Sequence, residues 1–372
     1  MQNKIKTTTT ITASLIIGLI MLSPITALPN VIASTNSQTQ TLSSIDLAKQ
    51  NMPKELSSSD LAKAVQIATS DGKVQSMIGG KSVKVLAQGF FGNIKENPVV
   101  WYPTLNIGID DKQQIMVVVD LVNGKVTQAD QGPDLDKRIS NTQRSWASDY
   151  YSGSSTIQGH EMTPTNPTFT PNSSYNFTAF LVNAVMSGST DSQLCNSGST
   201  SSYWMQTGFF FDPSSSAKTV WTDTKQSCSA LSTPITYNTS HSYQFYIFGD
   251  SVASKWTVEV FDNTLGTSYI HSVSGQSSFT LKVNDFNSGV FFENANTVHG
   301  TSSWNTQFSG TALSATALME QSGSWVNWNA DTKQDDQGCK PPITDTVITG
   351  NLQSGHSATW NLTTMANNYP AC

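Results

Sequence analysis

The sequence predicts a mainly β protein: a jelly-roll-like antiparallel β-sandwich with a small N-terminal α+β domain. From Tyr150 onward, short segments rich in aromatic and β-branched residues alternate with turns of Ser, Gly and Asn, which is typical of sandwiches and barrels. No long helical pattern interrupts these segments. Only 12 % of the residues are charged, well below the ~25 % of average soluble domains, and such a composition suits a secreted β-rich protein.

The length and the charge exclude two broad classes of protein. A chain of 372 residues with 37 % hydrophobic residues can bury at least one large core, which excludes intrinsic disorder. The net charge of −6 provides no basic face for phosphates. We therefore expect no nucleic-acid partner.

Residues 1–33 have the features of a secretory signal peptide. Lys4 and Lys6 precede an apolar stretch from Ala13 to Leu22, which is shorter than the ~20 residues of a membrane-spanning helix. We expect cleavage after Ala33, with Ala27 as the alternative site. A retained N-terminal anchor is the second interpretation. The first predicts a secreted or envelope-associated protein with no transmembrane segment in its mature form.

The cysteines fit that compartment, since an even number in a secreted chain indicates disulfides. They are Cys195, Cys228, Cys339 and Cys372. Three pairings are possible, and we favour Cys195 with Cys228 and Cys339 with Cys372 because neighbours in sequence close easily. Zinc ligation is the weaker interpretation, because no Cys-x-x-Cys occurs and the five histidines are scattered. We expect no metal and no cofactor.

The N-terminal half changes character along its length. Residues 34–57 are rich in Ser, Thr and Gln and predict a flexible leader, and residues 58–130 predict an α+β domain. Ser58-Ser59-Asp60 can cap a helix whose apolar residues recur with helical spacing. Three strands and an Asn123-Gly124 hairpin turn follow, over residues 83–91, 99–109 and 115–121.

The segment from Val117 to Val126 resembles the PepSY domains found in pro-regions of secreted peptidases, with another small α+β module as the alternative. Residues 131–148 then predict a linker. Residues 1–150 contain 14 Lys and Arg against 12 Asp and Glu, whereas residues 151–372 contain 6 against 14. Opposite net charges permit the two halves to dock on each other.

Residues 149–372 predict the sandwich, closed by a C-terminal extension with disulfides from Trp325 to Cys372. The expected strands cover residues 175–185, 202–211, 218–224, 243–248, 256–261, 267–273, 277–283, 290–293 and 310–319.

Several familiar catalytic patterns are absent from the sequence. It has no Gly-x-Ser-x-Gly elbow and no phosphate-binding loop. His160-Glu161 lacks the second histidine of a zinc protease helix and predicts a loop pair. Paired carboxylates for glycoside hydrolysis stay open as an alternative, because the nine Trp residues could stack on sugars.

One polar constellation in the predicted strands points to chemistry. Gln206 lies in an aromatic strand and shares its face with Trp204 and Gly208 through the two-residue alternation, and Glu293 ends an apolar run. A glutamate that takes a proton from water and an amide that donates to the developing oxyanion could hydrolyse a peptide bond in acid. Gln206 and Glu293 are therefore our candidate catalytic residues.

These segments resemble the glutamic peptidases (eqolisins, peptidase family G1), which have a concanavalin-like sandwich. The family's Leu-Gln-Thr-Gly matches residues 205–208, and its Trp-Ile-Val-Glu-Asp is similar to residues 290–294. The resemblance implies that Gln206 and Glu293 form the catalytic pair. The family's Asp-x-Trp-x-Glu is similar to residues 219–223, which adds Trp221 and Asp223 to Trp204 as candidate substrate-binding residues.

The chain departs from the family at two places. The substrate-cleft Trp before Val-Gly-Ile-Asp is represented at best by Phe180, our fourth candidate for substrate binding, and Thr219 replaces the first Asp of Asp-x-Trp. We interpret the protein as a secreted, monomeric acid endopeptidase for polypeptides, with the N-terminal region as a pro-segment. The alternatives are a lectin-like module that binds carbohydrate or the cell envelope without catalysis, and a structural envelope protein.

Overall fold

The protein is described by a computed structural model that covers residues 55–96, 98–110, 113–132, 143–165, 177–187, 204–211, 218–224, 231–232, 235–236, 238–274, 278–296, 311–338 and 344–364. All of them belong to one compact unit, Leu42–Cys372. The expected signal peptide, nearly all of the leader and the four cysteines lie outside the described residues.

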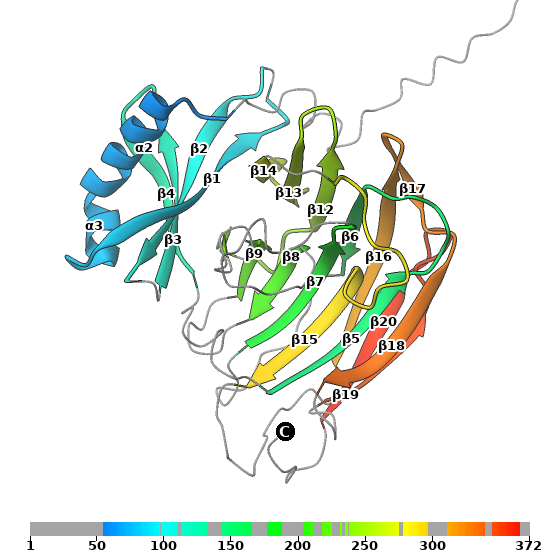
Figure 1. Cartoon of the computed structure of the whole chain (residues 1–372). Helices are drawn as coiled ribbons and strands as arrows, with labels where there is room; N and C mark the ends of the chain where they lie inside the picture. The colour runs from blue at the N-terminus through cyan, green and yellow to red at the C-terminus, as the bar shows by residue number, and fades with distance from the viewer. Residues whose placement is uncertain are drawn as a thin grey trace, which may run out of the picture. The chain divides into compact units, whose positions relative to one another are not determined.

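Two antiparallel sheets make up most of the described residues (Figure 1). The large sheet runs, in spatial order, β19 (Thr344–Gly350), β20 (Ala358–Thr364), β16 (Thr311–Gln321), β6 (Gly159–Pro164), β12 (Tyr243–Asp250), β13 (Lys255–Asp262), β14 (Thr267–Ser274), β1 (Val83–Asn93), β2 (Trp101–Ile109), β3 (Gln113–Asp120) and β4 (Lys125–Gln131), with β17 (Ser324–Asn327) paired to β16. The small sheet runs β10 (Leu231–Ser232), β9 (Lys218–Thr224), β8 (Trp204–Phe211), β7 (Phe177–Val185), β15 (Gly289–Asn296), β5 (Gln143–Tyr151) and β18 (Asp331–Gly338), with β11 (Ile235–Thr236) paired to β9. The predicted mainly β, antiparallel architecture is confirmed.

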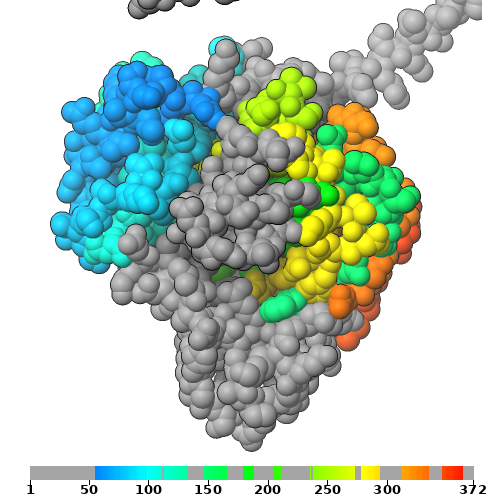
Figure 2. All heavy atoms as spheres, viewed as in Figure 1, coloured from blue at the N-terminus to red at the C-terminus, as the bar shows by residue number. Residues whose placement is uncertain are grey.

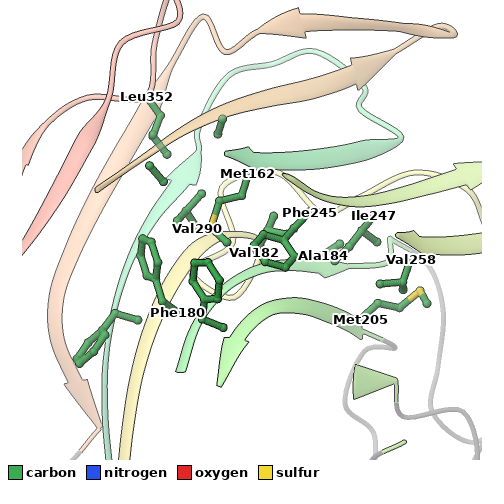
Figure 3. Close-up of a cluster of buried hydrophobic side chains, with 14 of the residues drawn as sticks. Met162, Phe180, Val182, Ala184, Met205, Phe245, Ile247, Val258, Val290 and Leu352 are labelled. Atoms are coloured by element: carbon green, nitrogen blue, oxygen red, sulfur yellow. The ribbon is translucent and has the colours of Figure 1, made fainter. Parts of the chain in front are cut away.

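One hydrophobic core draws its side chains from both sheets. The small sheet supplies Phe180, Val182 and Val290, and the large sheet supplies Met162 and Phe245 (Figure 3). The contributing residues alternate along each strand, as expected where one face of a sheet is buried. Because these side chains fill the core, the alternate residues of each strand point to the outer face of their sheet.

The N-terminal part is a four-stranded meander, β1 to β4, with helices α2 (Ser58–Ser70) and α3 (Gly72–Ile78) packed on one face. The cap of α2 is Ser57, whose hydroxyl accepts from the backbone N–H of Asp60, and Asp71 caps α3 in the same way. The outer sides of both helices lie at the surface (Figure 2). The predicted first helix is therefore present, and a short second helix follows it.

The meander and the sandwich are joined through a continuous ladder of strands. β1 pairs with β14 from Gly89–His271 to Asn93–Thr267. On the inner face of the meander, Met116 and Val118 belong to the same core cluster as the sandwich. The N-terminal part thus extends the large sheet beyond β14, and β14 is not an edge strand.

The structure differs from the sequence expectations in three places. β5 begins at Gln143, inside the stretch expected to be a linker, and the expected strand over 277–283 is reduced to one bridge between Leu281 and Met186. His160-Glu161, expected in a loop, lies in β6, where both side chains are buried. Partners on β12 and β16 satisfy the backbone of β6 and hold this short polar segment as a strand.

Close approach of β1 and β14 depends on Gly89, and this generates a prediction. A Cβ at position 89 would lie 2.2 Å from the carbonyl oxygen of Ile270, a backbone atom that cannot move alone. We expect Gly89→Val to separate the two strands and to increase amide hydrogen exchange along β14. The control is Gly72→Val, where a Cβ meets nothing within 4 Å. Unchanged exchange along β14 in Gly89→Val would contradict the continuous sheet.

Candidate functional site

The pairing of β8 with β7 places Gln206 on the outer face of the small sheet. Met205 and Phe209 point into the core, so the alternate residues Trp204, Gln206 and Gly208 occupy the opposite face. This arrangement matches the alternation expected from the sequence. Gln206 stands directly opposite Asn183 of β7.

Glu293 lies on the same face of the same sheet, on β15. Val290 and Phe292 of the same strand point into the core, so Glu293, at an alternate position, points to the outer face. Glu293 pairs with Ala179 of β7, which in turn pairs with Phe210 of β8. β7 is thus the one strand between the two candidate catalytic residues.

The two candidates lie on the same face of the sheet but are not aligned across the strands. Gln206 aligns with Gly289 through Asn183, so Glu293 stands four residues further along β15. With strand spacings of ~4.8 Å and a rise of ~3.4 Å per residue, the two Cα atoms would be roughly 17 Å apart in a flat sheet. One carbonyl group can meet both side chains only if the twist of the sheet shortens this distance and the two long side chains lean toward each other across β7.

The expected substrate-binding residues are divided between the two faces. Trp204 lies on the outer face, two residues before Gln206. Trp221 and Asp223 occupy the positions of β9 directly opposite Gly208 and Gln206, which belong to that face. The position of Asp223 is therefore adjacent to that of Gln206 on β9.

Phe180 departs from its expected role. Its side chain is fully buried in the core (Figure 3). Its ring packs edge-on against Trp360, with 5.1 Å between the centroids. It therefore points away from the face that carries Gln206. On β7 the outer face belongs to Ala179, Leu181 and Asn183, which alternate with Phe180.

The outer face around the two candidates is shielded from solvent. Gln206 is 8 % exposed, Glu293 is 7 % exposed and Asn183 is 4 % exposed. Ser148 of β5, which pairs with Phe291, is fully buried on the same face. Burial of polar groups is unfavourable unless they find hydrogen-bond partners.

Asn183 and Ser148 also lie on the site face, the outer face of the small sheet that carries Gln206 and Glu293. The sequence alone did not single them out. Among the described residues, neither the Oδ1 atom of Asn183 nor the hydroxyl of Ser148 finds a hydrogen-bond partner, although both atoms are buried. An unsatisfied buried polar atom costs about 1–3 kcal/mol. The available signal was a single amide in the otherwise apolar run from Leu181 to Val185.

Behind this face, β6 carries two titratable side chains whose pKa values are strongly shifted. His160 lies in the core beside Trp328, with its Nε2 atom 3.3 Å from the hydroxyl of Ser288, and burial lowers its pKa to about 3. Glu161 points to the other face, and burial raises its pKa to about 7 against the opposing effect of hydrogen bonds from Thr163 and Leu318. Neither residue contributes to the site face of the small sheet.

Within the ranges that the structure describes, no three His, Cys, Asp or Glu side chains come together as metal ligands. No helix in those ranges is long and apolar enough to cross a membrane.

No protein-family model and no curated protein matches the chain. Among solved structures, it is similar to scytalidoglutamic peptidase with a peptide-based transition-state analogue, at 15 % identity and a TM-score of 0.38 over 60 % of this chain and 99 % of that chain. A second structure of scytalidoglutamic peptidase, with a transition-state analogue inhibitor, matches at 14 % identity and a TM-score of 0.38 over 59 % of this chain and 98 % of that one. Lectin II from Ulex europaeus matches at 13 % identity and a TM-score of 0.20 over 57 % and 93 %. At these TM-scores no shared activity follows.

The shifted pKa values on β6 predict opposite effects of pH on stability. The unfolded chain protonates His160 near its ordinary value of 6.5, whereas the folded protein does so near 3. The contribution of neutral His160 to the free energy of unfolding is therefore complete above pH 6.5. It decreases by up to about 5 kcal/mol as the pH falls toward 3. Glu161 stabilises fully below its ordinary value of 4.5, and this contribution is lost as the pH rises through about 7.

Urea unfolding at pH 4 and pH 7 measures these contributions. We expect His160→Gln to lose less stability than the wild type on acidification, and Glu161→Gln to lose less between pH 4.5 and pH 7. Parallel pH dependences in the wild type and both variants would contradict the burial of these groups.

Proposed function

We propose that the protein is a peptidase of the glutamic type, which cleaves polypeptides in acid with Glu293 and Gln206. The observation that carries the proposal is the shared, shielded face: two polar side chains from separate strands, both more than nine-tenths buried, lie on the same side of one sheet. The local sequences around both residues resemble the peptidase motifs. Two independent features therefore select the same pair.

The proposed chemistry assigns different roles to the two side chains. The carboxylate of Glu293 takes a proton from a water molecule, which then attacks the scissile carbonyl carbon. The Nε2–H of Gln206 donates to the oxygen as it becomes negative, and protonated Glu293 returns the proton to the leaving amine. Low solvent exposure strengthens both interactions, because fewer waters compete for the same groups.

Trp204 and the positions of Trp221 and Asp223 surround Gln206 and form the proposed substrate-binding surface on its side of β7. Ala179, Leu181 and Phe210 form a small buried apolar cluster on this face, between the positions of Gln206 and Glu293. Gly208 has φ +152°, and a Cβ there would lie 2.3 Å from the carbonyl oxygen of Phe180, so a side chain is not tolerated. We propose that a bound polypeptide displaces what covers this cluster and crosses β7 there.

We further propose that the enzyme is secreted, on the signal-peptide pattern of residues 1–33, and acts as a monomer. The meander of β1 to β4 would act as the pro-segment or folding aid. The opposite net charges of the two halves support this role, since acid weakens their attraction by protonating carboxylates. Pairing of β1 with β14 gives the pro-segment a defined docking strand.

Cleavage of an unstructured protein between pH 2 and pH 7, with a chelator present, tests the proposal. We expect acid-dependent cleavage that resists the chelator, is abolished by Glu293→Gln and falls about 100- to 1000-fold in Gln206→Ala. The matched control is Glu161→Gln, which replaces another buried strand glutamate outside the site face and should retain activity.

Absence of cleavage by the full chain at every pH would contradict the proposal. Glycan binding that survives replacement of Gln206 and Glu293 would then favour the lectin-like alternative, in which the aromatic residues of the same face hold a sugar.

A further inference from the structure

Asn183 on β7 and the position of Asp223 on β9 are the two polar positions that strand pairing brings directly opposite Gln206. Of the two, Asn183 has a side chain whose burial the structure describes. The pairing places the Cα atoms of Asn183 and Gln206 about 4.5–5.5 Å apart and their side chains on one face. On its other side, Asn183 pairs with Gly289, which has no side chain. Its nearest cross-strand side chain on β8 and β15 is therefore that of Gln206.

The side chain of Asn183 has a buried hydrogen-bond acceptor that no described residue uses. The side chain is 4 % exposed, and its buried Oδ1 atom finds no hydrogen-bond partner among the described residues. Native proteins leave few such atoms unsatisfied, and an exception calls for a physical explanation. A role in packing does not explain it, because an apolar residue would fill this position in β7 without the penalty.

The proposed chemistry requires one orientation of the Gln206 amide. Only the Nε2 side of that group can donate to a developing oxyanion, whereas the Oε1 side would repel it. The two orientations have nearly the same shape, so packing alone does not choose between them. A fixed acceptor beside the amide does choose, because it binds one of the two N–H groups.

We propose that Asn183 is a positioning residue for the reaction: its Oδ1 atom accepts a hydrogen bond from Nε2 of Gln206 when a polypeptide occupies the face. The second N–H of the same amide then points at the scissile carbonyl oxygen. This inference rests on the proposed function and adds the residue that orients its oxyanion donor. Asn183 does not touch the reacting atoms.

Kinetics of two variants measure the effect of the acceptor. We expect Asn183→Leu, which removes it, to lower kcat about 10- to 100-fold with KM changed less than about twofold, because the donor is misoriented while substrate contacts remain. Asn183→Asp keeps an oxygen acceptor and should recover most of kcat, with a changed pH profile. Asn106→Leu, which removes a buried amide from β2, is the matched control and should leave kcat unchanged.

A double-mutant cycle separates positioning from direct binding. If Asn183 acts through Gln206, then Asn183→Leu added to Gln206→Ala should change kcat less than about twofold. Additive losses would overturn the inference.

A readout that needs no cleavage separates this inference from the proposed function. The side-chain amide signals of Gln206 can be identified in NMR spectra by their loss in Gln206→Ala. We expect them to move when an unstructured peptide is added to the Glu293→Gln protein, and not to move when Asn183→Leu is also present. The same result in a protein whose wild type cleaves nothing would keep the pairing and reject the peptidase. Signals that respond identically with and without Asn183 would overturn the inference, whatever the activity.

Discussion

The antiparallel register of β8, β7 and β15 is the constraint on which the candidate site depends. In these strands Met205, Phe180 and Phe292 point into the core, and their burial holds each strand in place. A slip of one residue would exchange the two faces and carry Gln206 and Glu293 into the apolar interior. The same packing that stabilises the sandwich therefore keeps both polar side chains on its outer face.

The second constraint is the ladder between β14 and β1. It makes the N-terminal meander part of the large sheet, and Met116 and Val118 share a cluster with residues of the sandwich. Detachment of the meander would uncover both the edge of β14 and these apolar side chains, which makes an unprotected edge prone to pairing with other chains. The meander therefore helps to stabilise the sandwich.

Much of the architecture could be predicted from the pattern of apolar residues. β9 has the predicted bounds, and β7, β8, β12, β13 and β14 differ by a few residues at their ends. Strand β5 was missed because charged residues precede it closely, and β6 because His160 and Glu161 gave it the composition of a loop. Tertiary pairing, which a local pattern does not contain, holds both segments in strands.

The candidate site shows a sharper limit of local reasoning. The shared face of Trp204 and Gln206 followed from alternation alone. The same rule places Phe180 on the opposite face from Asn183, because their positions differ by three. The core position of Phe180 could therefore be predicted from the sequence once Asn183 was recognised as a site residue. The offset of four residues between Gln206 and Glu293 was not accessible, because it depends on connections of unknown geometry between β7, β8 and β15.

The central claim is that one polypeptide carbonyl meets both Gln206 and Glu293 on this face. A crystal structure of the Glu293→Gln protein with an uncleaved peptide tests it most directly. We predict a peptide that crosses β7, with its scissile carbonyl oxygen within about 3 Å of Nε2 of Gln206 and a water held by residue 293 within about 3.5 Å of the carbonyl carbon. A peptide bound elsewhere, or one in contact with only one of the two side chains, would contradict the account.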